Sequence, residues 1–100
     1  MLKNFIVNTS ASSSVPVCSV GNGVELSIMS IMINSPNESS WVRLNFFDSN
    51  GKIFTANFTI DMGDTIILDN KINLPSGSGF MVDSGVDGIC IMVSAAELAV

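Results

Sequence analysis

Apolar and polar residues alternate along this chain in short runs, which Gly, Pro, Asn, Asp and Ser residues separate. A period of two residues is typical of a β-strand with one buried face, and many short runs between turn residues are typical of a sandwich or barrel. No stretch of useful length has the period of a helix, and the Ala/Glu/Leu-rich piece at residues 95–98 is too short for a stable helix. The pattern predicts these strand segments: Asn4–Asn8, Val15–Val20, Val24–Ile33, Trp41–Asp48, Lys52–Ile60, Thr65–Leu68, Lys71–Leu74, Gly79–Asp83 and Gly88–Val93.

The fold class predicted from this pattern is all-β. We expect a single antiparallel β-sandwich domain of about eight short strands over residues 1–100, with either a jelly-roll or an Ig-like strand order. One hundred residues suit one domain and can bury a core without disulfides or metals. None of the connecting segments is long enough to be a linker, and no internal repeat is present.

The clearest single element is a hairpin over residues 41–60. A two-residue loop of Asn50 and Gly51 would place Phe46 opposite Thr55, which matches an apolar with a polar residue. A three-residue loop that also includes Ser49 places all the alternating apolar residues on one face. We therefore expect the second register, with Gly51 in the left-handed conformation that follows a type I turn. Its pairs are Phe46 with Phe54, Leu44 with Ala56, and Val42 with Phe58.

Two of the expected strands carry apolar residues on both faces. In the hairpin, Trp41, Phe47 and Ile53 fall on the outer face. In the strand over residues 24–33, the face that begins with Glu25 and Ser27 turns apolar further along, whereas Val24, Leu26, Ile28 and Met32 form the other face. A solvent-facing sheet does not normally do this. Loops could cover these residues, a bulge near Ser30 could exchange the faces, or another subunit could pack there. The candidate protein-interface residues are Trp41, Phe47, Ile53, Met29, Ile31 and Ile33.

Composition supports the interface interpretation. Charged residues make up 13% of the chain, about half the usual share of roughly 25%. Either the abundant Ser and Asn residues solvate the surface, or an assembly hides part of it, and we favour assembly. The net charge of −5 includes only four cations, which excludes nucleic acid and anionic membranes as favoured partners. No apolar stretch has the length of a membrane span, and the opening residues lack the apolar core of a signal peptide, so we expect synthesis in a cytoplasm.

The residues that catalysis most often needs are missing. The absence of His removes the commonest general base and metal ligand, together with every Ser-His or Cys-His arrangement. The Asp residues at 61, 64, 83 and 87 are better explained as turn caps than as a calcium site. We expect no catalytic, cofactor or metal site and no enzyme activity. Cys18 and Cys90 are expected to be reduced, with a bridge between the terminal strands as the alternative.

The order of these elements resembles the small β-sandwich virion structural proteins of tailed bacteriophages. A Gly21-Asn22-Gly23 turn stands where such proteins usually carry a Pro-Ala-Gly-like turn. The residues that carry the resemblance cover nearly the whole chain: Phe5-Ile6-Val7-Asn8, Cys18-Ser19-Val20, the long strand Val24 to Ile33 with Asn34-Ser35, the hairpin Trp41–Ile60, Gly63-Asp64-Thr65-Ile66-Ile67-Leu68, Lys71-Ile72-Asn73-Leu74, Gly79-Phe80-Met81-Val82, Val93-Ser94 and Glu97.

The resemblance implies a structural protein of the virion, with a capsid decoration or cement protein favoured. It implies contacts with the major capsid protein or other virion proteins and a homo-oligomer, with a trimer favoured. The alternatives are a head–tail or tail component, or an Ig-like or lectin-like module that binds a cell surface. The resemblance carries over no catalytic residues.

Overall fold

The computed structural model describes all residues from 1 to 100 and contains nine β-strands and no helix. Every predicted segment is confirmed as a strand, but the last strand continues past Val93 to Ala99, through the Ala/Glu/Leu-rich piece. The structure holds no helix of the length and hydrophobicity that crossing a membrane would need. The strands are β1 Leu2–Asn8, β2 Val15–Ser19, β3 Val24–Asn34, β4 Ser40–Phe47, β5 Ile53–Ile60, β6 Thr65–Leu68, β7 Ile72–Leu74, β8 Gly79–Ser84 and β9 Cys90–Ala99.

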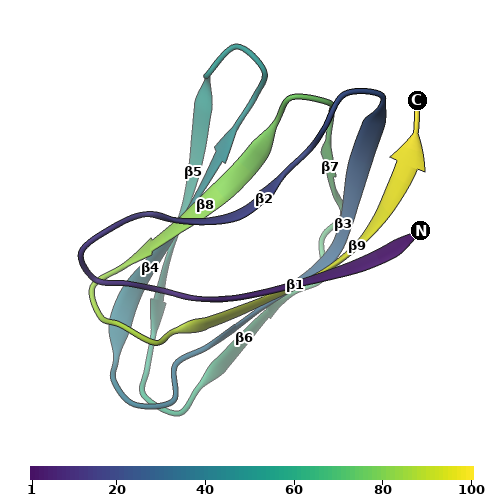
Figure 1. Ribbon diagram of the computed structural model, residues 1–100. Helices are drawn as coiled ribbons and strands as arrows, with labels where there is room; N and C mark the ends of the chain where they lie inside the picture. Colours follow the sequence, from purple (N-terminus) through teal and green to yellow (C-terminus); the bar gives the residue numbers. More distant parts are fainter.

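The strands form two antiparallel sheets that pack face to face as a sandwich (Figure 1). One sheet has the order β1-β9-β3-β6, with β7 also paired to β3, and the other has the order β2-β8-β4-β5. The first two strands of an Ig-like sandwich lie in the same sheet, whereas β1 and β2 lie in different sheets here. The strand order therefore agrees with the jelly-roll alternative and not with the Ig-like one.

The β4–β5 hairpin has the predicted three-residue loop. Phe46 lies opposite Phe54, and the whole ladder follows the register predicted from the apolar alternation. The backbone amide of Asp48 donates to the carbonyl of Lys52 at 3.0 Å, and that of Gly51 donates back to the carbonyl of Asp48 at 3.0 Å. Gly51 has a φ of 80°, the left-handed conformation that this turn requires. Turn chemistry and the hydrophobic pattern therefore specify the same register.

A β-bulge in β3 explains why its apolar face changes sides. The pairing of β3 with β9 shifts register between Ile28 and Ser30, so Met29 is the extra residue. Before the bulge Leu26 and Ile28 are buried, and after it Ile31 and Ile33 take their place, at 1% and 0% exposure. The assignment of Ile31 and Ile33 to an interface is thus wrong, because the bulge turns both side chains into the core. For the same reason Met32, assigned to the inner face, lies outside.

The core between the sheets contains 17 buried apolar residues from both layers. Phe80 is completely buried and stacks on Phe46 with 4.8 Å between the ring centroids. Close approach of the backbones at the start of β8 depends on Gly79. A Cβ atom there would lie 2.8 Å from Cζ of Phe47 and 3.1 Å from Cα of Ser19, and it would also collide with the carbonyl of Cys18.

Gly79→Ala is therefore expected to lower the free energy of unfolding by about 3 kcal/mol, the upper end of the usual overpacking cost. Chemical denaturation monitored by fluorescence measures it. Gly21→Ala is the matched control, because no atom lies within 4 Å of a Cβ at that position. Equal stability of the two variants would contradict the close packing of β2 on β8.

The two cysteines are free, as expected from the sequence. Cys18 is buried on β2, whereas Cys90 is half-buried on β9 in the other sheet. Burial raises the pKa of the Cys18 thiol from 9.0 to about 11, partly opposed by a hydrogen bond with the Phe80 backbone.

A thiol reagent at pH 8 is expected to modify Cys90 in the native protein and to reach Cys18 only after unfolding, because the thiolate is the reactive form. Counting modified thiols with and without denaturant measures this difference. The raised pKa also favours the protonated thiol in the folded state, so stability should fall as the pH rises from 9 towards 11. Rapid modification of both thiols in the native protein would contradict the burial of Cys18.

Candidate functional site

The structure divides the six predicted interface residues among four places. Trp41 is 46% exposed at one end of the outer face of β4, and Phe47 and Ile53 lie opposite each other at the other end. Met29 is exposed at the bulge on the other sheet. Ile31 and Ile33 are in the core. The six residues therefore do not form one surface.

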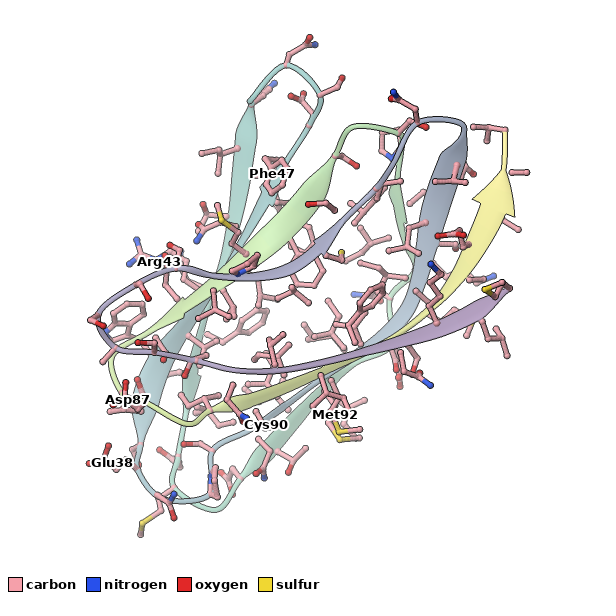
Figure 2. All side chains as sticks on the ribbon, viewed as in Figure 1. Glu38, Arg43, Phe47, Asp87, Cys90 and Met92 are labelled. Carbon is pink, nitrogen blue, oxygen red and sulfur yellow. The ribbon has the colours of Figure 1, made fainter.

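A polar network separates Trp41 from Phe47 and Ile53. Asn45 donates from Nδ2 to Oδ2 of Asp83 at 2.9 Å and accepts from the hydroxyl of Thr55 at 3.0 Å. Arg43 extends over Trp41, with its guanidinium carbon 4.9 Å from the ring centroid, and its Nε lies 3.8 Å from Oδ2 of Asp83. Figure 2 shows Arg43 and Phe47 along this outer face. The face therefore has two separate apolar points and no continuous patch.

A continuous apolar surface does exist, on the outer face of the other sheet. Ile6 pairs with Met92, Met92 pairs with Met32, and Met32 pairs with Ile67, so one residue from each of β1, β9, β3 and β6 stands side by side. Their exposed fractions range from 36% for Met32 to 63% for Ile6. Cross-strand neighbours of this kind touch one another. We call Ile6, Met92, Met32 and Ile67 the outer row; Figure 2 labels Met92 on β9.

The rows beside the outer row are polar but carry no charge. One consists of Asn8, Cys90, Asn34 and Thr65 in register across the same four strands. The row on the other side contains Asn4, Ser94 and Ser30, and the hydroxyl of Ser94 donates to Oδ1 of Asn4 at 3.2 Å. In a protein with a net charge of −5, the paired residues on both sides of the outer row thus include no charged side chain. Depletion of charge around an apolar centre is the compositional sign of a protein interface.

Sequence reasoning missed the outer row for two reasons. Met32 was assigned to the inner face because the bulge at Met29 had no certain position in the sequence. Ile6 and Ile67 lie within unbroken apolar runs, where no alternation shows which side chains face the core and which face outwards. Only a correct position for the bulge would have placed Met32 on the outer face.

A hollow of about 340 Å³ lies beside Trp41. It is bordered by the loop of residues 10–14, which contributes four serines, and by Arg43 and Asp83. The hydroxyl of Ser14 donates to Oδ1 of Asp83, and Asp87 accepts a hydrogen bond from the amide of Ala11 at 2.7 Å, so the strand and loop carboxylates hold the serine loop in place. The hollow offers hydroxyl groups, a guanidinium and an aromatic face.

The groups in the structure that could bind a metal are dispersed. Nowhere do three or more His, Cys, Asp or Glu side chains come together. No protein-family model and no curated protein matches the chain.

Proposed function

We propose that this chain is a non-catalytic structural protein of a tailed-bacteriophage virion that decorates the capsid and stabilises it through protein–protein contacts. The observation that carries the proposal is the outer row, a line of four exposed apolar side chains between two rows of uncharged polar residues. Exposed apolar side chains that form a continuous line, rimmed by uncharged polar groups, are typical of a surface that another protein covers.

The size of the molecule fits such a contact. Its extents of 41 × 25 × 17 Å give each broad face an area on the order of 1,000 Å². Stable protein interfaces bury about 800 Å² on each partner. The broad face of the β1-β9-β3-β6 sheet can therefore supply a complete interface.

The virion setting rests on the resemblance of the sequence pattern, and so does the favoured trimer. A jelly-roll sandwich occurs in capsid and lectin domains alike, so the fold alone does not select a function. A protein that binds the assembled shell and not its free subunits stabilises the shell by mass action. That role needs a rigid module with an exposed interface and no catalytic group.

Co-sedimentation with phage heads tests the proposal. The genes beside that of this chain identify the heads to use, and a major capsid or portal gene is the expected neighbour. We expect the wild-type protein to pellet with heads at a saturating, fixed ratio, and Met92→Asp to lose binding while its unfolding transition is kept. Ser19→Asp is the matched control, because it adds the same charge to an exposed position on β2 of the other sheet. Absence of pelleting, or equal binding by Met92→Asp, would rule out the proposal.

The hollow beside Trp41 favours a second candidate, a lectin-like module that binds a glycan. An exposed indole beside serine hydroxyls and an Arg–Asp pair can stack on a sugar ring and hydrogen-bond its hydroxyls. Low aromatic content and the absence of Tyr count against it, because binding loops are typically rich in Tyr and Trp. Trp41 is the only tryptophan, so its fluorescence reports directly on this hollow. A saturable change on titration with cell-surface oligosaccharides would support the lectin, and no change would support the structural role.

A further inference from the structure

The strand β5 is an unprotected edge of the β2-β8-β4-β5 sheet. It pairs with β4 on one side and with no strand on the other. From Ile53 to Ile60 it contains no charged residue, no proline and no glycine. Natural edge strands usually carry such residues, or are short or bulged, because a regular edge recruits another strand.

The other edges of the two sheets have these protective features. Strand β2 has a bulge after Pro16. Strands β6 and β7, which both pair with β3 at the same edge, are only four and three residues long. Strand β1 carries Lys3, which forms a salt bridge of 2.9 Å with Glu97. Protection is therefore missing at β5 alone.

The hydrogen-bonding groups that β5 leaves free can be assigned from its register. The carbonyl of Lys52 accepts from Asp48, so the backbone groups of even-numbered residues in β5 point towards β4. The N–H and C=O groups of the odd-numbered residues consequently point out of the sheet, and they specify an extended strand as their partner. These residues are Ile53, Thr55, Asn57 and Thr59.

The inner face of β5 also lacks a cover. Phe54 points inwards but is 70% exposed, with its ring centroid 6.4 Å from that of Phe46. An apolar groove of about 240 Å³ lies between the sheets at this side. Figure 1 shows the sheets diverging towards the tip of the β4–β5 hairpin. The groove is lined by Ile31, Leu44, Phe46, Phe54, Ala56, Phe58, Leu68, Asn70 and Ile72.

We propose that β5 is the site at which two copies of this chain associate, by antiparallel pairing of β5 with β5 of the second copy across a two-fold axis at Ala56. The two sheets then form one continuous sheet of eight strands, and this two-fold dimer takes the place of the trimer that the resemblance favours. Thr55 exchanges backbone hydrogen bonds with Asn57 of the second copy, and Phe54 lies opposite Phe58 of the second copy. The two grooves face each other across the axis, so each copy shields the phenylalanines of the other.

The second copy is favoured over another extended segment by charge and by side-chain pattern. Two copies that each carry a net charge of −5 repel each other over most of their surfaces, and β5 brings no like charges opposite one another. The strand is also complementary to itself about Ala56, with aromatic opposite aromatic inside and polar opposite polar outside at Thr55 and Asn57. The outer row lies on the other sheet and stays free for the proposed virion contact.

Asn57→Pro tests the proposal without breaking the fold. Proline removes an N–H that has no partner within the chain and blocks the ladder between copies. Asn57→Ala is the matched control because it keeps the N–H. In sedimentation equilibrium we expect the wild type and Asn57→Ala at twice the 10.6 kDa chain mass, and Asn57→Pro at 10.6 kDa with a retained unfolding transition.

Hydrogen exchange identifies the interface in the same samples. The amides of Thr55 and Thr59 should be protected in the wild-type dimer and lose that protection in Asn57→Pro. A wild-type monomer at all concentrations, a trimer, or a dimer that persists in Asn57→Pro would each overturn the proposal. If Asn57→Pro loses self-association but still binds heads as the wild type does, the proposed function stands. The association through β5 and the proposed function can therefore fail separately.

Discussion

Ile31→Asp is expected to prevent this protein from folding, so that no cooperative unfolding transition is observed. Met32→Asp, one position further along β3, is expected to fold. The bulge at Met29 turns Ile31 inwards at 1% exposure and leaves Met32 on the outer face. A carboxylate at Ile31 would be buried without a partner, which costs more than the total stability of a small domain can offset. The same group at Met32 stays solvated, and we expect a loss of about 1 kcal/mol.

Denaturation curves of the two variants, recorded side by side by circular dichroism, measure this difference. Each variant is the control of the other, since the substitutions introduce the same side chain into neighbouring positions. The reverse order of stability would place the bulge elsewhere in β3 and remove Met32 from the outer row.

A second pair of variants compares a buried with an exposed phenylalanine, which lie on either side of Phe46 in the same cluster of aromatic rings. Phe80 is fully buried and stacks on Phe46, which in turn lies next to the exposed Phe54. Phe80→Ala should lower the free energy of unfolding by about 3–5 kcal/mol, the usual cost of emptying a core site. Phe54→Ala should cost less than about 1 kcal/mol, because most of that ring is already in contact with solvent.

Chemical denaturation in the Asn57→Pro background measures both values for the isolated chain, so that association through β5 does not contribute. Similar costs for Phe80→Ala and Phe54→Ala would mean that the sandwich is closed at the β5 side. That result would contradict the open groove and remove one basis for the pairing of β5.

Most of the fold could be predicted from the sequence because its signals are local. Alternation located the strands, and Gly51 together with the apolar series from Val42 to Phe58 determined one hairpin register. The long-range order of the strands could not be chosen from two alternatives, because the alternation of a strand does not identify its neighbours. The end of β9 was missed since Ala95 and its neighbours are strand through their pairing with β3 and β1, and not through their own propensity.

The candidate surface was predicted poorly because it depends on one extra residue. The sequence shows that β3 is apolar on both faces, but the change of side at Met29 is visible only from the pairing of β3 with β9. With that shift, Ile31 and Ile33 leave the predicted surface and Met32 joins it. Four strands then contribute one residue each to the outer row, a coincidence of register that no single segment reveals.

The thermal stability of phage heads measures the central claim most directly. A decoration protein binds only the assembled shell, so the temperature at which heads release their DNA should rise with the concentration of this protein and level off when the sites are filled. We expect this rise with the wild type and with Ser19→Asp, and no rise with Met92→Asp. Heads that release DNA at the same temperature with and without the wild-type protein would contradict the account.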